Sequence, residues 1–328
     1  GIRDRDVTGV QTCALPILFH LLAAGLILYS LTLVLFCLAS TRESVFALRL
    51  FEGLALSAVY VSADVVLCRV SRDEERGRWL SYYGIALSLG LLAGPALILC
   101  TEKIRKGSAL VPVLTGLALL VILTAIASFF HQLAPAPQDQ EEKGGIHTQA
   151  GVAAMIYGFL EAGLVAVLAA LTVARFQADG EMVFVILILA AAPASLIWGL
   201  SIDRIGGKKT LLRVFFLFAI CQLVLLFLRD KAPGFQMAYF TAAAFGVAAG
   251  GIYPAGFAWL VDGCSPRKLG YASAYFTRAY GLGSLLGPVC FGIAVEKAGE
   301  VGFFSLSLLL GLIGLIWAGR SLNARGVC

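Results

Sequence analysis

Charge is scarce in this chain of 328 residues: Asp, Glu, Lys and Arg together make up 14% of it, whereas 59% is hydrophobic. A water-soluble domain of this length could not bury so much apolar surface, so lipid must be the solvent for much of the chain. The charges form no patch suited to nucleic acid, and the net charge of +5 is typical of loops that meet lipid head groups.

Motifs of enzymes are also missing. The sequence contains no H-E-x-x-H, no G-x-S-x-G and no phosphate-binding glycine loop, and its three histidines are scattered. We therefore expect no catalytic activity and no cofactor. The eight cysteines include no C-x-x-C pair and lie mostly inside apolar stretches, which predicts packing residues rather than disulfides or metal ligands.

What the chain has instead is a series of apolar stretches of about 20 residues, the length of a helix that crosses a bilayer. They lack the alternation of apolar and polar residues that a transmembrane barrel requires. The pattern predicts an all-α polytopic membrane protein with ten spans, near 18–39, 44–68, 79–100, 108–131, 151–173, 181–200, 210–228, 235–261, 270–296 and 301–320.

The basic residues of the loops indicate an orientation. If "SIDRIGGKKT" (201–210) is cytoplasmic, thirteen Lys and Arg lie on its side of the membrane and eight on the other. This positive-inside bias predicts a bacterial-type inner membrane protein with a cytoplasmic C-terminus. Residues 132–150 are rich in Pro, Gly and charge, so we expect a cytoplasmic linker there.

The chain contains an internal repeat. Residues 270–288 align with 77–95 without gaps, at an offset of 193, and eight of nineteen positions are identical. The same offset pairs Tyr60 with Tyr253 in the preceding spans. The repeat is parallel, because an even number of crossings separates equivalent helices. Two like halves joined by a linker are typical of secondary transporters.

Three motifs carry a resemblance to the major facilitator superfamily. "GLSIDRIGGKK" (199–209) resembles the family's signature loop, "RLFEG" (49–53) an element of the fourth family helix, and "GLLAGP" (90–95) the core of a fifth-helix motif of antiporters. The last match is imperfect, because Ser81 stands at the motif's first glycine, and "GSLLGP" in the other half resembles it too. The resemblance implies two six-helix bundles and transport of a small solute by alternating access, in an efflux or antiporter-like branch.

The repeat also bears on the N-terminus. A twin of 151–210 should end at residue 17, yet residues 1–17 resemble neither a span nor a signal peptide. Back-translated, residues 7–17 resemble a sequencing-library adapter. We hypothesise that 1–17 is adapter read-through, that the first two of twelve helices are missing, and that such a fragment should not transport. A genomic read that encoded this N-terminus would contradict the hypothesis.

The expected organisation follows from these observations. An incomplete N-terminal bundle at 18–131 (family helices 3–6) and the linker at 132–150 precede a six-helix bundle at 151–320 and a cytoplasmic tail at 321–328. We expect a monomer whose partners are the lipid bilayer and a small-molecule substrate, with the proton gradient as the energy source.

Glu161 is the first candidate for coupling transport to protons. It lies ten residues into its span, about 15 Å at 1.5 Å per residue, near the bilayer midplane. An ionised side chain there costs about 2.5–3.5 kcal/mol on insertion scales, which favours a proton-titrating or cation-binding role. The alternative is a protonated structural acid bonded to a neighbouring helix.

Three other charged residues lie within spans. Arg49 and Glu52 share one helix face and form either a proton-sensitive couple or a static ion pair. Arg278 lies about 12 Å into its span. The family resemblance favours a gating pair with an acid of the opposite half. Attraction of an anionic substrate and snorkelling to the surface are the other interpretations of Arg278.

Other candidates form the gate. In the signature loop these are Gly199, Asp203, Arg204, Gly206, Lys208 and Lys209, and the resemblance implies that Asp203 lies near the positive N-terminal end of the helix beginning near Gly77. Asp64 and Asp262, near cytoplasmic span ends, are predicted gate or cap residues. Close helix approach and helix bends are expected at Gly90, Gly94, Pro95, Gly283, Gly287 and Pro288.

We therefore predict a secondary transporter of a small solute, with proton-coupled efflux as its finer form. A proton-independent facilitator, or a membrane sensor or scaffold of the same fold, is the alternative.

Overall fold

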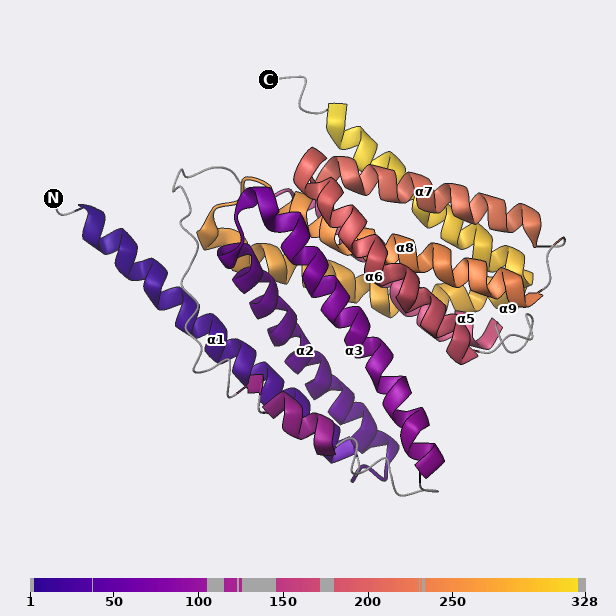
Figure 1. Ribbon diagram of the computed structural model, residues 1–328, viewed down its shortest axis with the longest axis horizontal. Coiled ribbons are helices and arrows are strands. Elements are labelled where there is room, and N and C mark those ends of the chain that lie inside the picture. The colour runs from indigo at the N-terminus through magenta and orange to yellow at the C-terminus, as the bar shows by residue number, and fades with distance from the viewer. Residues whose placement is uncertain are drawn as a thin grey trace. The chain divides into compact units, whose positions relative to one another are not determined.

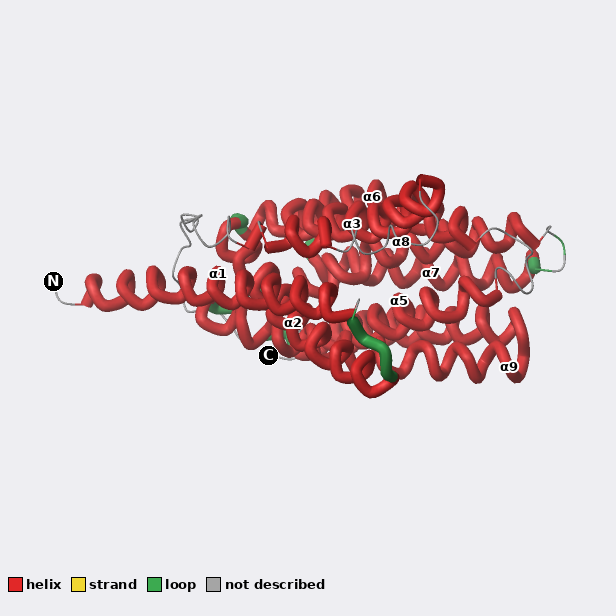
Figure 2. The backbone as a smooth tube through the Cα atoms, turned by 90° about the horizontal axis from the view of Figure 1, so that it is seen from below, coloured by secondary structure: helices red, strands yellow, loops and turns green. Residues whose placement is uncertain are grey.

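The computed structural model describes residues 3–36, 38–104, 115–122, 124–125, 146–171, 180–229, 231 and 234–323. These residues are almost entirely helical and contain no strand (Figure 2). The predicted all-α class is therefore confirmed. Most of the expected span at 108–131, most of the expected linker and the end of the tail lie outside the described residues.

The long helices follow the apolar stretches of the sequence. They are α1 (Arg3–Phe36), α2 (Arg42–Val70), α3 (Arg76–Ile104), α5 (Gly151–Leu171), α6 (Gly180–Ile205), α7 (Gly207–Leu228), α8 (Gly234–Leu260) and α9 (Leu269–Asn323), with short 3-10 turns η1 (Asp73–Glu75), η2 (Thr148–Ala150) and η4 (Pro266–Lys268) (Figure 1).

Seven stretches of the described helices are long and apolar enough to cross a membrane. They are Ile17–Phe36, Arg42–Val70, Thr148–Leu168, Met182–Ile205, Gly207–Leu228, Phe235–Leu260 and Leu269–Arg320. The first begins one residue before the expected start at Leu18, although α1 itself begins at Arg3. Residues 3–17, which were not expected to form part of a membrane span, are therefore helical.

The longest stretch covers two expected spans. Within α9, Gly299 has a non-helical backbone with φ of 57°. A Cβ on Gly302 would lie 2.0 Å from the carbonyl oxygen of Ala294. In a straight helix eight residues would separate these positions by about 12 Å. The chain therefore reverses at Gly299, and α9 consists of two antiparallel arms, which match the expected spans at 270–296 and 301–320.

The element boundaries repeat with the offset read from the sequence. Shifting η1 by 193 residues gives 266–268, the range of η4, and shifting Arg76 gives Leu269, where α9 begins. Shifting α2 gives 235–263, close to the bounds of α8. The predicted parallel repeat is thus present in the secondary structure as well as in the residue identities.

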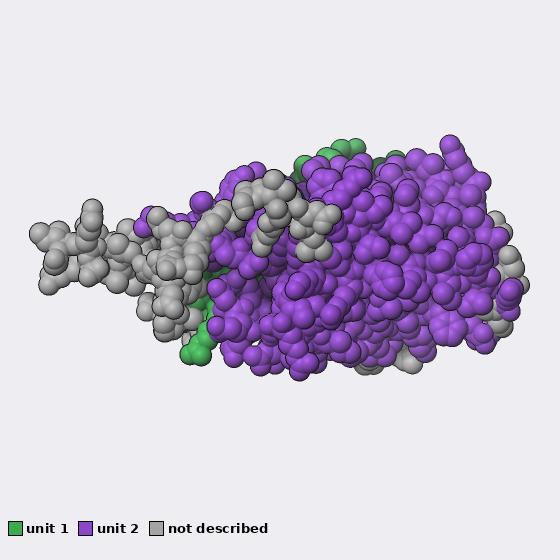
Figure 3. Space-filling model, turned by 90° about the horizontal axis from the view of Figure 1, so that it is seen from above, with its two compact units in different colours: residues 1–72, 93–139 green, residues 73–92, 140–328 purple. Residues whose placement is uncertain are grey.

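The chain forms two compact units (Figure 3). Unit 1 comprises residues 1–72 and 93–139, and unit 2 comprises 73–92 and 140–328. In unit 1, α1 packs on α2 where Gly25 meets the side chain of Val59. Unit 2 holds the N-terminal part of α3 and all helices from α5 to α9.

The core of unit 2 depends on close helix approach between α5 and the first arm of α9. A Cβ on Gly283 would lie 1.9 Å from the carbonyl oxygen of Met155, and one on Gly287 would lie 2.3 Å from that of Phe159. The same contact requires a glycine on α5: a Cβ on Gly158 would lie 2.1 Å from the carbonyl oxygen of Tyr280, on α9. Glycine is required at these positions because any side chain would force the two backbones apart.

Candidate functional site

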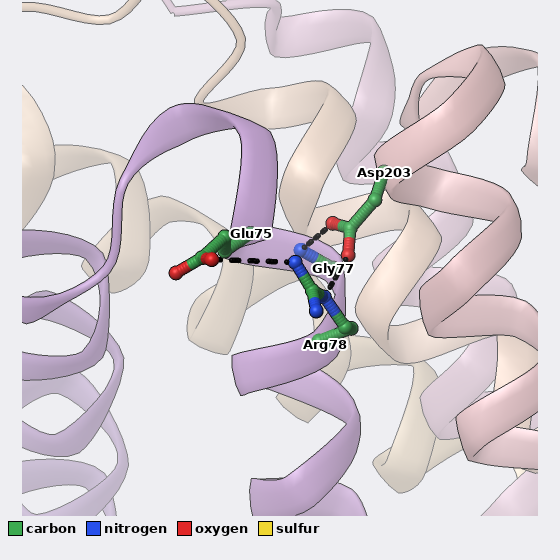
Figure 4. Close-up of polar contacts among 4 residues, drawn as sticks. All are labelled: Glu75, Gly77, Arg78 and Asp203. Atoms are coloured by element: carbon green, nitrogen blue, oxygen red, sulfur yellow. Dashed lines mark hydrogen bonds and ion pairs between the residues drawn. The ribbon is translucent and has the colours of Figure 1, made fainter.

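The carboxylate of Asp203 joins two helices of unit 2 (Figure 4). Asp203 is in the last turn of α6, and its Oδ1 accepts a hydrogen bond of 2.7 Å from the backbone N–H of Gly77, in the first turn of α3. Its Oδ2 accepts a second bond of 2.9 Å from Nε of Arg78, and a further bond of 3.3 Å joins Arg78 to Glu75. The acid thus satisfies a free amide at the positive end of α3 and neutralises a neighbouring guanidinium.

Two glycines allow this contact. A Cβ on Gly77 would lie 2.5 Å from the carbonyl oxygen of Gly199, and a Cβ on Gly199 would lie 2.2 Å from the Ser81 hydroxyl oxygen. The backbones of α3 and α6 therefore meet directly beside Asp203. The position expected for Asp203 is the one observed, and we refer to Gly77, Arg78, Gly199 and Asp203 as the α3–α6 clasp.

The connection from α6 to α7 is a single residue. Gly206 has φ of 85°, a left-handed conformation that favours glycine, and separates Ile205 from Gly207. Beyond it, Lys208 places its ammonium 5.3 Å from the centre of the Trp259 ring on α8. Arg204 and Lys209 are exposed. The signature loop is thus a tight turn with two exposed bases, Arg204 and Lys209, and a third, Lys208, that packs on Trp259.

Glu161 is the middle residue of α5. The hydroxyl of Tyr280, on the first arm of α9, donates a hydrogen bond of 2.8 Å to its carboxylate. Tyr157, one turn earlier on α5, also donates a side-chain hydrogen bond to it. No ion pair joins Glu161 to another described residue. A carboxylate in a span is therefore held by two phenols rather than by a base.

The phenols belong to a row of four tyrosines from four helices, which we call the tyrosine wall. Ring centres are 5.5 Å apart for Tyr157 and Tyr280, 6.0 Å for Tyr157 and Tyr253, and 6.3 Å for Tyr253 and Tyr83. All four side chains are half-buried, as is Glu161. The hydroxyl oxygen of Tyr83 is itself buried. The wall is therefore only partly accessible.

Unit 1 contains a second acid within a span. Nη1 of Arg49 lies 2.6 Å from Oε2 of Glu52, and the Arg49 guanidinium lies 4.8 Å from the centre of the Phe36 ring. The Arg49 side chain is 67% exposed, whereas that of Glu52 is 12% exposed. The predicted pair is present in the structure, and both interpretations of its role remain predictions.

The remaining charged candidates do not join these contacts. Arg278 is exposed, and no ion pair connects it to another described residue. Asp262 is exposed just after α8, as expected of an acid at a span end. Asp64 differs: it is 2% exposed, because α2 continues for six more residues to Val70.

The two glycine motifs also differ. Gly283 and Gly287 make the expected close approach to α5, and Pro288 follows them within α9. Nothing that the structure describes lies within 4 Å of a Cβ on Gly90. The close approach expected there is not found. Gly94 and Pro95 lie in α3.

The family model of the Major Facilitator Superfamily matches residues 19–152 and 150–323. The chain belongs to the Major Facilitator Superfamily. A related protein, described as the uncharacterized MFS-type transporter YfkF of Bacillus subtilis (strain 168), is 26% identical over 284 residues, which span 80% of this chain and 69% of that protein.

A solved structure shares the fold. The crystal structure of the Major Facilitator Superfamily transporter FucP, in the outward conformation, matches with a TM-score of 0.65 and 17% sequence identity, over 94% of this chain and 85% of that one. As a member of the superfamily, this chain is a multi-pass membrane transporter. The substrate must be inferred from the side chains of this protein itself.

The tyrosine wall of this superfamily member was not predicted from the sequence. Its four residues are spread from position 83 to position 280 and share no motif. Each lies on a different helix, so only the packing of α3, α5, α8 and α9 brings them together. One available signal was the tyrosine pair Tyr60 and Tyr253 at the offset of the repeat.

Proposed function

We propose that the protein is a secondary active transporter that moves a small solute by alternating access and couples this movement to protons through Glu161. The observation that carries the proposal is the position of Glu161, in the middle of α5 and bonded to Tyr280 rather than to a base. A carboxylate without a counter-ion inside a span is costly, and such residues mark ion or proton pathways. Uptake and release of a proton changes its charge at that site.

The α3–α6 clasp supports a second part of the proposal, which is that two access states exist. The clasp consists of two hydrogen bonds from charged or polar donors to Asp203. Bonds to a charged group contribute about 1.5–3 kcal/mol each, less where water reaches them as it does Arg78. A contact of this strength can hold one state and still be broken during a transport cycle. We propose that the clasp acts as such a latch.

The expected setting of this activity rests on the loop charges. We propose that the bases Arg204, Lys208 and Lys209 face the cytoplasm of a cell bounded by an inner membrane, and that the C-terminus lies on the same side. The proton gradient is then the energy source, no bound cofactor is required, and efflux in exchange for protons is the direction that the fifth-helix motif favours.

Transport in proteoliposomes tests the proposal. The protein is reconstituted, a pH gradient is imposed, and movement of a panel of labelled solutes is followed with wild type and with Glu161→Gln. The amide can still accept a bond from Tyr280 but cannot carry a proton, so we expect gradient-driven accumulation to be lost. Exchange of solute down its own gradient should persist.

Glu296→Gln is the matched control, because Glu296 is an exposed acid near the end of the first arm of α9. Solute movement that is insensitive to the pH gradient in wild type would indicate a facilitator. Absence of movement for the whole panel would favour a sensor or scaffold. Unchanged gradient-driven accumulation by Glu161→Gln would remove Glu161 from the coupling role.

A further inference from the structure

A short segment before α5 lies across the ends of several helices of unit 2. It consists of residues 146–150, which include the turn η2, and Ala150 within it is fully buried. The backbone N–H of His147 donates a hydrogen bond of 3.0 Å to the carbonyl oxygen of Leu260, the last residue of α8. Carbonyl oxygens at the end of a helix have no partner within it, so the segment caps α8.

Both arms of α9 bind the same segment. The hydroxyl of Tyr275, on the first arm, donates a hydrogen bond of 3.0 Å to the carbonyl oxygen of Thr148. Nε1 of Trp317, on the second arm, donates a bond of 3.0 Å to the carbonyl oxygen of Gln149. Three consecutive residues are therefore bonded through their backbone to three different helical segments. We call residues 146–150 the strap.

The chemistry of these contacts suits a segment that detaches and binds again. A Cβ on Gly151 would lie 2.6 Å from the Tyr275 ring, so a glycine at the end of the strap lets the ring reach it. The bonds from Tyr275 and Trp317 are neutral and lie at the accessible surface. Water can replace such bonds at low cost, so the strap can be released while the helices stay folded.

We propose that the strap is a releasable fastening: when bound, it holds the adjoining ends of α8 and of both arms of α9 together, and it detaches when these ends separate during transport. Each bond should favour the fastened state by about twofold to tenfold, so the strap opposes separation without preventing it. The α3–α6 clasp joins other helices of the same unit, and the strap is therefore a second fastening. This inference rests on the proposed function, because alternating access supplies the movement that the strap is to resist.

Amide hydrogen exchange tests whether the strap detaches. With the protein in lipid nanodiscs, we expect the peptide that covers residues 146–150 to exchange faster than the adjoining helix α5, because the strap opens without unfolding of the helix. Tyr275→Phe and Trp317→Phe each remove one donor and keep an aromatic ring in its place. Each should accelerate exchange of the strap by about twofold to tenfold, the range expected for one hydrogen bond.

Trp198→Phe and Tyr271→Phe are the matched controls. Nε1 of Trp198 donates an equivalent bond of 3.0 Å to the carbonyl oxygen of Val247, elsewhere in unit 2, and Tyr271 is 63% exposed one turn before Tyr275. Neither control should change exchange of the strap. A strap that exchanges as slowly as α5 in wild type, or whose exchange is unchanged by loss of the Tyr275 and Trp317 donors, is a permanent cap, which overturns the proposal.

A reversible cross-link tests whether transport requires the release. Gln149→Cys and Trp317→Cys are combined in a variant whose other cysteines are replaced by serine, and a short bifunctional methanethiosulfonate reagent joins the two thiols. We expect solute movement in proteoliposomes to stop and to return on reduction. Movement that continues with the strap cross-linked overturns the proposal and leaves alternating access as measured. If no variant moves any solute, the proposed function fails, while fast exchange that depends on the two donors still upholds a releasable strap.

Discussion

The first arm of α9 and its repeat counterpart α3 begin alike and pack differently. Both follow a 3-10 turn, and an offset of 193 residues superimposes their first residues. Gly283 touches the backbone of α5, whereas nothing described lies within 4 Å of its counterpart Gly90. The same contrast holds for charge, since Arg49 and Glu52 correspond to Ala242 and Phe245. The repeat determines where helices begin, and each half has its own contacts and charges.

The largest effect is expected when one glycine on each helix is replaced by alanine. Gly283→Ala places a Cβ 1.9 Å from the carbonyl oxygen of Met155, so α5 and α9 must separate. Overpacking of this kind costs about 3 kcal/mol, and the thermal unfolding midpoint in detergent, followed by circular dichroism, should fall clearly. Gly90→Ala should leave the midpoint unchanged or raise it slightly, because alanine favours helix. Equal effects of the two substitutions would contradict the described packing.

A smaller effect is expected at the N-termini of the two helices. The clasp satisfies Gly77 at the start of α3, while the turn before α9 has no side-chain cap at Ser265. Asp203→Asn keeps one acceptor for Gly77 but loses the charge opposite Arg78, which should lower stability by about 1–2 kcal/mol. The exposed neighbour Arg204 provides the control Arg204→Gln. If both variants unfold at the same temperature as wild type, the clasp has no stabilising role.

The charged pair of α2 should contribute less. Glu52→Gln removes the partner of Arg49, whose side chain is 67% exposed, so we expect a loss of about 0.5–1 kcal/mol. Increasing salt should reduce the difference between wild type and variant, because ions screen exposed pairs. Ala242→Ser at the uncharged counterpart is expected to be insensitive to salt. A loss of several kcal/mol would mean that Glu52 has partners beyond Arg49.

The smallest effect is expected for the reactivity of a cysteine just before α9. At the offset of 193 residues, Cys264 in this turn corresponds to Ser71 in the turn before α3. Burial raises the pKa of the Cys264 thiol, and the positive charges of Lys268 and Arg76 partly offset this. A raised pKa means less thiolate at neutral pH, so maleimide labelling of a variant with Cys264 as its single cysteine should be slow at pH 7 and accelerate as the pH rises. Arg76→Gln should slow labelling further at pH 7. Labelling that is fast at pH 7 and flat with pH would contradict the described burial.

Much of the fold was predictable because lipid imposes a simple rule on sequence. Spans must be apolar over about 20 residues, so helix class and most boundaries follow from composition alone, including the reversal between residues 296 and 301. The position of Asp203 was also predictable, because the resemblance of residues 199–209 to the superfamily's signature loop implies that this acid lies near the start of the helix at Gly77. The contacts of α5 were not, because Gly158 shows its importance only where another backbone meets it.

The tyrosine wall illustrates a further limit. Tyr83, Tyr157, Tyr253 and Tyr280 each look like ordinary interfacial or packing residues, and hydrophobic periodicity does not show which rings of different helices will lie against one another. The burial of Asp64 was missed for a related reason: the end of α2 lies beyond the apolar stretch that marked the expected span.

The reversal at Gly299 has a consequence for how the protein enters the membrane during synthesis. Glu296, Lys297 and Glu300 lie within three residues of Gly299, so the tip of the hairpin is polar although no separate loop exists. Carrying such a tip across the bilayer is unfavourable for one arm alone, at about 2.5–3.5 kcal/mol for each charge at the centre. Two apolar arms that leave the translocation machinery together can compensate for that cost. We therefore expect the last two spans to integrate as one unit, so that a chain ending near Gly299 would be retained poorly in the membrane.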